Sequence, residues 1–282
     1  MKGQFLLLAV LCLGLSGWAQ TDSTARSSAT GGNDGDTLRI GGLIIVRNGK
    51  GNGVDNPNIR VYGRHKYRND YKPANVSTNW CILDLGFSAF TDKTDYSSAS
   101  AQQFAPGATS DWFHLRTIKS VNVNIWLFMQ RMNLIKHVVN LKYGLGLELN
   151  NYRYTQNIKY LTNPTKIIMD TISYSKNKLA ADYFTVPFML NFNFTPHRKN
   201  GLALSLGASA GYKYSSRQKL ISGEFGKKKT FDDFDMEPWK ISWIGELQLG
   251  PVRLYGSLAT KSMFQKGLDQ TPFTLGIRLS NW

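Results

Sequence analysis

Residues 139–150, VNLKYGLGLELN, decide the fold because their side chains alternate in character at every step. One set is apolar and comprises Val139, Leu141, Tyr143, Leu145, Leu147 and Leu149. The residues between them are Asn140, Lys142, Gly144, Gly146 and Glu148. Successive side chains of a β-strand point to opposite faces, so a period of two places each set on its own face. The stretch therefore predicts a strand with one apolar face and one polar or small face.

The same alternation recurs in seven other segments, and together they predict an all-β chain. These segments are residues 80–89, 120–130, 185–194, 202–214, 239–249, 252–258 and 273–279. The alternation assigns Trp80 and Phe128 to the polar set and Met129 to the apolar set. Several segments span 10–12 residues, which exceeds the roughly 5–6 residues common in globular sheets. Pro187 lies inside one segment and cannot donate to a neighbouring strand, so we expect a bulge or a missing backbone hydrogen bond there.

Two features favour a membrane barrel with an apolar exterior over a soluble barrel. The polar set is rich in Asn, Ser and Gly, which suits a narrow lumen better than a solvated face. The connections also alternate in length: residues 131–138, 195–201 and 250–251 are short, whereas residues 90–119, 155–182 and 215–238 are long. Short turns on one side and long loops on the other are typical of transmembrane barrels.

Aromatic residues at the ends of the apolar rows suggest two bilayer interfaces. We expect an aromatic girdle of Tyr212, Tyr214, Trp239 and Phe273 at the long-loop end, and of Tyr143 and Phe194 towards the short turns. Because lipid offers no partner to unpaired backbone groups, the sheet must close on itself. The expected fold is an eight-stranded antiparallel up-and-down transmembrane β-barrel with an N-terminal extension, whose lumen is filled by side chains.

Charged residues on the polar faces need partners inside such a barrel, because an unpaired buried charge is costly. The expected lumen network comprises Asp84, Lys142, Glu148, Lys213, Lys240, Glu246, Arg253 and Arg278. Its simplest role is to hold the barrel closed. A proton or solute path is the alternative, although eight strands leave little room for one.

The N-terminus predicts export. Lys2, an apolar run at residues 5–15 and the sequence Gly17-Trp18-Ala19 are typical of a secretory signal peptide at residues 1–19. Residues 20–78 then form a periplasmic linker with one short strand-like piece at residues 38–46, interrupted by Gly41-Gly42, and residues 79–282 form the barrel. Cleavage leaves Cys81 as the one cysteine of the mature chain, so we expect no intramolecular disulfide.

The chain is basic, with 34 Lys and Arg against 19 Asp and Glu and a net charge of +15. Export argues against nucleic acid as the partner. The run Lys227-Lys228-Lys229 could instead meet phosphates of lipopolysaccharide, and the basic residues between 60 and 72 could meet an acidic periplasmic or outer-membrane protein partner. Solvated loops are the simpler explanation for both clusters.

Candidate catalytic and metal-binding residues are few. The histidines are His65, His114, His137 and His197, and no two of them share a metal-ligand spacing. We expect neither a metal nor a cofactor. His114 with Ser110 or Ser120 is the one constellation that could serve a lipid-modifying enzyme, and we expect no enzymatic activity.

Several segments resemble the PorT-like small outer-membrane β-barrel family of Bacteroidota. They are CILDLGF at residues 81–87, LKYGLGLELNNYRY at 141–154, KLAADYFTVPFMLNF at 178–192, LSLGASAGY at 204–212 and PFTLGIRLSNW at 272–282. The resemblance covers residues 79–282 and implies a barrel in the outer membrane. Trp282 is the terminal aromatic residue of such barrels, yet it is out of phase with the apolar row of residues 273–279.

These observations lead us to expect a non-enzymatic outer-membrane protein with a structural or interaction role, whose mobile long loops and N-terminal segment make contacts. Some members of the resembling family belong to protein-secretion machinery. The alternative is therefore an accessory subunit of a secretion or envelope-assembly complex, with residues 38–46 adding a strand to a partner's sheet. A lipid-modifying enzyme and a small pore are further alternatives.

Overall fold

The computed structural model describes residues 36–40, 43–47, 59–62, 73–198 and 200–280. The predicted signal peptide at residues 1–19 and most of the basic segment between residues 60 and 72 lie outside the described residues. The chain divides into two compact units, Met1–Asp70 and Tyr71–Trp282.

The first unit contains a small antiparallel sheet. Its strands are β1 (Asp36–Ile40), β2 (Leu43–Arg47) and β3 (Ile59–Tyr62), in that order across the sheet. Residues 38–46 thus belong to two paired strands, with Ile40 opposite Leu43, and not to one interrupted strand as the sequence suggested. Gly41-Gly42 separates these two partners in the sequence, and a two-residue Gly-Gly connection is a strong hairpin signal.

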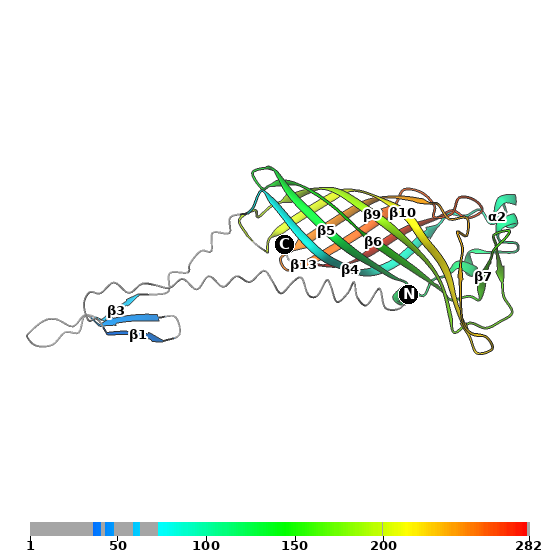
Figure 1. The fold of residues 1–282 in the computed structure, drawn as a ribbon, viewed down its shortest axis with the longest axis horizontal. Helices are drawn as coiled ribbons and strands as arrows, with labels where there is room; N and C mark the ends of the chain where they lie inside the picture. Colours follow the sequence, from blue (N-terminus) through cyan, green and yellow to red (C-terminus); the bar gives the residue numbers. More distant parts are fainter. Residues whose placement is uncertain (1–35, 41–42, 48–58, 63–72, 199, 281–282) are drawn as a thin grey trace, which may run out of the picture. The chain divides into compact units, whose positions relative to one another are not determined.

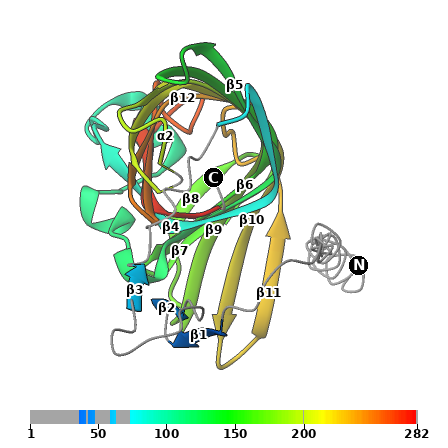
Figure 2. The ribbon, with the colours of Figure 1, turned by 90° about the vertical axis from the view of Figure 1, so that its left-hand side faces the viewer.

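The second unit contains a closed ring of eight antiparallel strands, which confirms the predicted fold class (Figures 1 and 2). The strands are β4 (Val76–Asp92), β5 (Val121–Ile135), β6 (Val139–Tyr154), β9 (Lys176–Asn193), β10 (Leu202–Ser222), β12 (Trp239–Leu249), β13 (Val252–Ala259) and β14 (Gln270–Leu279). The ring closes where β14 pairs with β4. Each segment of alternating residues lies in one of these strands, and β4 begins at Val76, just before the expected start of the barrel at Asn79.

The connections alternate in length as predicted. Short turns join β5 to β6, β9 to β10 and β12 to β13. The long connections carry the helix α2 (Ala99–Phe104), the 3₁₀ turns η2 (Ser110–Phe113) and η3 (Thr117–Lys119), the hairpin of β7 (Ile158–Leu161) and β8 (Lys166–Met169), and the strand β11 (Gly226–Phe231). These elements lie at one end of the barrel (Figure 1). Among the described helices, none is long and apolar enough to span a membrane.

The strands separate polar from apolar side chains as the alternation predicts. In β9, for example, Phe184, Val186, Phe188 and Leu190 are exposed on the outer face. The alternate residues Thr185, Met189 and Asn191 are buried in the lumen. The barrel therefore has an apolar exterior and a polar interior.

A bulge in β4 and β5, near Cys81 and Leu127, reverses the alternation of inward-facing and outward-facing side chains. Trp80 pairs with Phe128 and Ile82 with Trp126, so Cys81 and Leu127 lie between paired positions, and Cys81 has φ of +53°. Trp80 is consequently 70% exposed outside the barrel, and Met129 is fully buried inside it. The sequence alternation placed both on the opposite faces, because an extra residue in a strand reverses the alternation beyond it.

Pro187 interrupts the ladder on one side, as predicted. Between β6 and β9, Tyr143 pairs with Phe188 and Gly146 pairs with Thr185. Val186 and Pro187 lie between these two pairs, where the pairing is interrupted. On the other side Pro187 stays in register with Ser209 of β10.

Two glycines face each other where the ring closes. Gly86 of β4 is the direct partner of Gly276 of β14, and the ring of Tyr255 lies against both. A Cβ at Gly276 would overlap with the backbone of Leu85 and Gly86. Only glycine permits this approach, so the closing pair requires the absence of side chains.

Gly276→Ala is expected to lower the free energy of unfolding by about 1–3 kcal/mol, because the added methyl group overpacks the closing strands. The test is the urea midpoint of the barrel folded in lipid vesicles. The folded fraction is measured from the difference in gel mobility between the folded and the unfolded chain in unheated samples. Gly256→Ala is the matched control, because its Cβ would meet Thr274 O at 3.6 Å and Leu275 Cδ1 at 3.7 Å, which are ordinary contacts. Equal midpoints for the two variants would contradict this account.

Candidate functional site

A group of buried charges lies where the barrel closes. Asp84 of β4 and Arg278 of β14 are cross-strand partners in register. Arg278 Nε donates to Asp84 Oδ1 at 2.8 Å, and Arg278 Nη2 donates to Asp84 Oδ2 at 2.7 Å. Such a bidentate pair is among the stronger polar contacts in proteins. It joins the two strands whose pairing completes the ring.

The charge group also reaches across the lumen. Arg278 donates from its remaining terminal nitrogen to Glu246 of β12. Lys142 of β6 donates to both carboxylate oxygens of Glu246 at 2.8 Å. All four side chains are at most 4% exposed. Four strands, β4, β6, β12 and β14, are therefore linked by one chain of charges.

Polar side chains complete the surroundings of this group. Trp126 Nε1 donates to Asp84 Oδ2 at 2.7 Å, and Asn124 Nδ2 donates to the same oxygen at 3.3 Å. Asn122 Nδ2 donates to Asn124 at 3.0 Å and to Asn150 at 2.9 Å. The alternation had placed these residues on the inner face but had not indicated their role. They supply the hydrogen bonds that a buried carboxylate requires.

A second ion pair lies further along the lumen. Lys240 of β12 donates to Glu148 of β6, and both are buried. Glu148 also accepts from Asn150 Nδ2 at 3.0 Å and from Thr185 Oγ1 at 3.4 Å. This pair links β6 to β12 a second time.

The remaining predicted lumen cations have other partners. Arg253 donates to the carbonyl and hydroxyl oxygens of Ser280. Lys213 was expected to pair with a strand carboxylate, but it binds Asp233 in the connection after β11 and donates to the carbonyl of Met236 at 2.7 Å. Asp233 comes from a loop that folds back onto the barrel, and the alternation of the strands contains no information on this fold.

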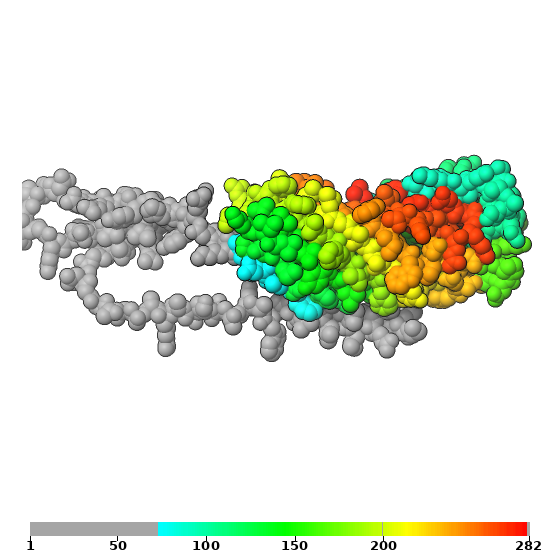
Figure 3. Space-filling view, turned by 90° about the horizontal axis from the view of Figure 1, so that it is seen from above, coloured from blue at the N-terminus to red at the C-terminus, as the bar shows by residue number. Residues whose placement is uncertain are grey.

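The long connections form a packed cap at one end of the barrel. Their buried members, together with residues at the strand ends, are Phe104, Ala105, Ala108, Phe113, Tyr152, Tyr154, Ile158, Tyr160, Ile167, Leu179, Ala181, Tyr183, Phe234, Met236, Met263, Phe264 and Leu268. Tyr160 contacts Phe234 with ring centroids 5.4 Å apart and stacks on Phe264 at 6.4 Å. In the space-filling view the teal connection between β4 and β5 forms this end together with the green connection beside it (Figure 3). The loops predicted to be mobile contact surfaces thus share a common apolar core.

Hydrogen bonds tie the cap to the strand ends. Asp92, the last residue of β4, accepts from Tyr96 Oη at 2.6 Å and from Gln270 Nε2 at 3.0 Å. Burial and this hydrogen bond to Asp92 raise the pKa of the Tyr96 hydroxyl above its ordinary value. Tyr96 therefore stays neutral and continues to donate. The carboxylate of Asp92 therefore connects the loop after β4 to the first residue of β14.

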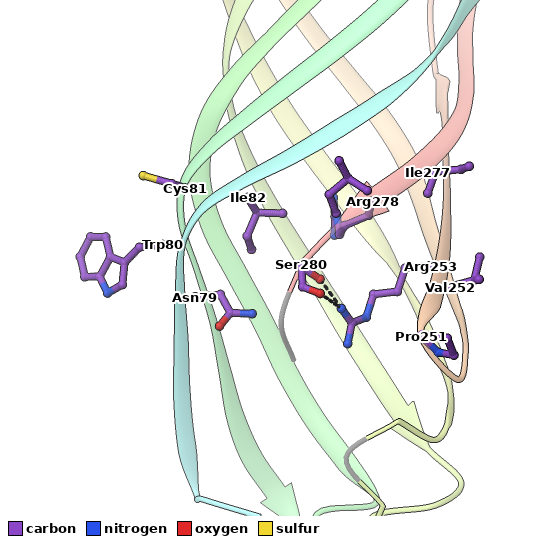
Figure 4. Close-up of a pocket in the computed structure, with 11 residues that line it drawn as sticks. Asn79, Trp80, Cys81, Ile82, Pro251, Val252, Arg253, Ile277, Arg278 and Ser280 are labelled. Carbon is purple, nitrogen blue, oxygen red and sulfur yellow. Dashed lines mark hydrogen bonds between the residues drawn. The ribbon is translucent and has the colours of Figure 1, made fainter. Parts of the chain in front are cut away.

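The opposite end has an opening in the wall. Pairing between β4 and β14 stops at Leu83 and Leu279, whereas β4 continues to Val76. A cavity of about 510 Å³ lies there. Trp80 and Cys81 point out of the barrel, whereas Arg253 and Arg278 point inwards (Figure 4). Residues 281–282, including the predicted terminal aromatic Trp282, lie outside the described residues.

The predicted girdle residues lie on or near the outer face. Tyr212 contacts Trp239 with centroids 5.0 Å apart, and Tyr214 contacts Phe184 at 4.6 Å. Phe194 and Phe273 are also exposed. Tyr143 is half-buried and donates to Gln130. Phe188 and Trp243 are exposed as their apolar parity predicts, although the expected girdle did not include them, and the exposed ring of Trp80 belongs to the other parity.

His114 and Ser120, two of the candidate catalytic residues, have contacts with other groups. The His114 side chain is 68% exposed, with Asp111 at 3.9 Å. Ser120 is fully buried, and its hydroxyl donates to Arg116 O at 3.1 Å and accepts from Arg153 N at 2.9 Å. Within the described ranges, no group of three His, Cys, Asp or Glu residues could hold a metal ion.

Comparison with protein families agrees with this architecture. The family model of the outer membrane protein β-barrel domain matches residues 84–265. The chain belongs to this family. The match begins at Asp84 and includes seven of the eight ring strands in whole or in part, and it places the protein in the outer membrane. No curated protein matches the sequence.

As an outer-membrane barrel, the chain must keep its interior charges paired in a medium of low polarity. Arg278→Met would leave Asp84 without its bidentate partner and would remove one of the two cations that donate to Glu246. We expect a loss of about 3–5 kcal/mol in the free energy of unfolding, measured as the urea midpoint in lipid vesicles.

Lys266→Gln is the control for this variant. Its ion pair with Asp235 is largely exposed, with side chains 63% and 29% accessible, so its removal should change stability by less than about 1 kcal/mol. An Arg278→Met barrel as stable as the control would show that the buried charges do not hold the seam.

Proposed function

We propose that this outer-membrane barrel is a non-enzymatic, non-conducting scaffold with a structural or interaction role at the cell envelope. The observation that carries the proposal is the filled interior. Ion pairs link β4, β6, β12 and β14 across the lumen, and the aromatic cap covers one end. An eight-stranded barrel is narrow enough for side chains to fill it completely.

The charge group supports a structural role over a proton or solute path. Each carboxylate in it accepts from at least one cationic partner, and Glu246 accepts from both Lys142 and Arg278. A conducting path would need groups that exchange partners as an ion passes. Fixed bidentate contacts between strands instead resist opening of the sheet.

The proposed orientation has the cap outside the cell. Outer-membrane barrels have short periplasmic turns and longer extracellular loops. With that orientation, β4 begins on the periplasmic side, and the N-terminal segment before Val76 is periplasmic. The aromatic pairs Tyr212–Trp239 and Phe184–Tyr214 then mark the outer interface, and Phe194 and Tyr143 lie towards the inner one.

A second candidate function is an accessory subunit of a secretion or envelope-assembly complex. Two observations favour it: the resemblance to the PorT-like family of Bacteroidota, and the small sheet of β1, β2 and β3 in the N-terminal unit. The strands β1 and β3 are the edges of that sheet. An edge strand can accept a strand from a partner through backbone hydrogen bonds.

The scaffold proposal predicts no steady conductance when the purified barrel is inserted into planar lipid bilayers. The reason is that ion pairs cross the narrow lumen and the aromatic cap covers one end, which leaves little room for ions to pass. The measurement is single-channel recording at moderate salt, with a known porin as the positive control. Discrete channels that change in size in Lys142→Met and Glu246→Gln variants would assign a pore to this lumen and overturn the proposal.

The subunit alternative predicts a defined crosslink from the N-terminal sheet. A photo-crosslinking residue at Leu38 in β1 should capture one periplasmic or outer-membrane protein in native membranes, whereas the same residue at Lys261 in the cap should not. Recovery of the barrel alone after mild detergent extraction, without a crosslinked species at Leu38, would favour the independent scaffold.

A further inference from the structure

A row of basic side chains crosses the sheet where it extends beyond the lumen. Lys229 of β11 is directly opposite Lys219 of β10, and Lys219 is directly opposite Lys178 of β9. Lys178 is in turn opposite Arg153 of β6. Neighbouring strands are about 4.8 Å apart, so four cationic side chains follow one another across four strands.

More basic residues flank this row on the same face. Lys227 and Lys176 lie in the adjacent row, on either side of Ile221. Arg217 lies on the other side of Lys219 and forms an ion pair with Asp182. We call this surface the basic wall; it comprises Arg153, Lys176, Lys178, Arg217, Lys219, Lys227 and Lys229.

The alternate residues of these strands show that the basic wall faces outwards. Tyr152, Tyr154 and Leu179 are buried in the cap. Gln218 Nε2 donates to Ile158 O at 3.0 Å, so its side chain points into the cap as well. The basic residues between them therefore point away from the cap. In β11 this alternation separates Lys227 and Lys229 from Lys228, which is opposite the buried Leu220.

The basic wall carries more positive charge than its own partners neutralise. Lys176, Lys227 and Lys229 all lie close enough to Lys219 to repel it. Lys178 donates to the neutral Asn151 at 2.6 Å, and Arg153 donates to the carbonyl of Ser175 at 2.9 Å. Like charges directly opposite each other destabilise a sheet. An external anion would relieve this repulsion.

The position of the basic wall indicates the source of that anion. Asp182 and Arg217 lie in the strands just beyond Phe184 and Tyr214, whose exposed rings are in contact. Rings of this kind favour the boundary between acyl chains and headgroups. Phe231, which is 63% exposed, lies directly opposite Arg217. Basic and aromatic side chains on one face suit an amphiphile with an anionic headgroup better than a free ion.

We propose that the basic wall binds the phosphate groups of a phosphorylated glycolipid in the outer leaflet, of the lipid A type. The proposal rests on the orientation proposed above, with the cap outside the cell. Lys219 and Lys229 hold the phosphates at the centre of the row, and Phe231 contacts the apolar part of the lipid. The barrel would thus be anchored in its leaflet by charge as well as by its apolar exterior.

The test is binding of fluorescent bisphosphorylated lipid A to the full chain, folded in zwitterionic detergent at fixed ionic strength. The variant is Lys219→Gln with Lys229→Gln. The matched control is Lys228→Gln with Lys261→Gln, which removes the same charge at exposed positions off the wall. We expect the first variant to lose roughly 30-fold in affinity, equivalent to about 1 kcal/mol per residue, and the control to lose less than about 3-fold.

Three results would overturn the proposal. The first is an equal loss of affinity for lipid A in the two double variants. The second is equal binding of dephosphorylated lipid A by the unmodified chain. The third is full competition by inorganic phosphate at millimolar concentration, which would indicate a general anion site. Folding of both variants is verified by the gel mobility shift, and Lys219→Gln alone replaces the double variant if that barrel does not fold.

The orientation is tested separately in whole cells. A Cys81→Ser, Lys261→Cys variant should react with a membrane-impermeant thiol reagent if the cap is outside. Failure of labelling would overturn the orientation and, with it, the placement of the lipid site in the outer leaflet. Because lipid binding in detergent does not depend on orientation, failure of binding would overturn the lipid site and leave the orientation intact.

Discussion

The pairing of β14 with β4 is the contact on which the rest of the structure depends. In hydrocarbon an unpaired backbone amide or carbonyl has no alternative partner, so an open sheet is not viable. The chain meets this constraint with Gly86 facing Gly276, which lets the two backbones approach closely. It adds the bidentate pair of Asp84 with Arg278 two residues further along the same strands. Close backbone contact and charge therefore reinforce one seam.

Much of the fold could be predicted from the sequence because one face of each strand is apolar throughout. The alternation identified the eight ring strands and placed Asp84, Lys142, Glu148, Glu246 and Arg278 in the lumen. It failed where geometry departs from a regular strand. The irregularity at Cys81 in β4 reversed the face of Trp80, and the one at Leu127 in β5 reversed the face of Met129. No residue type marks such a bulge in advance.

The loops could not be predicted in the same way. The pairing of Lys213 with Asp233 and the contacts of Tyr160 with Phe234 and Phe264 join segments that are distant in the sequence. Alternation describes local geometry and contains no information on which loop folds onto which. The extension of β9 and β10 beyond the lumen was likewise missed, and with it the alignment of Lys178, Lys219 and Lys229. Lys142, Lys240 and Arg278 inside the barrel face acids, whereas Lys178, Lys219 and Lys229 on this extension face one another.

The composition of the cap has a consequence for the order of assembly. Phe104, Tyr160, Phe234 and Phe264 come from four different long connections, the last of which directly precedes β14. Contacts between distant segments form late, since the chain between them must first be confined. The aromatic core cannot be completed before the final hairpin is in place, so a nascent barrel keeps an accessible mouth until its last strand arrives. Resistance of the cap to protease should therefore appear only after the last strand has been inserted.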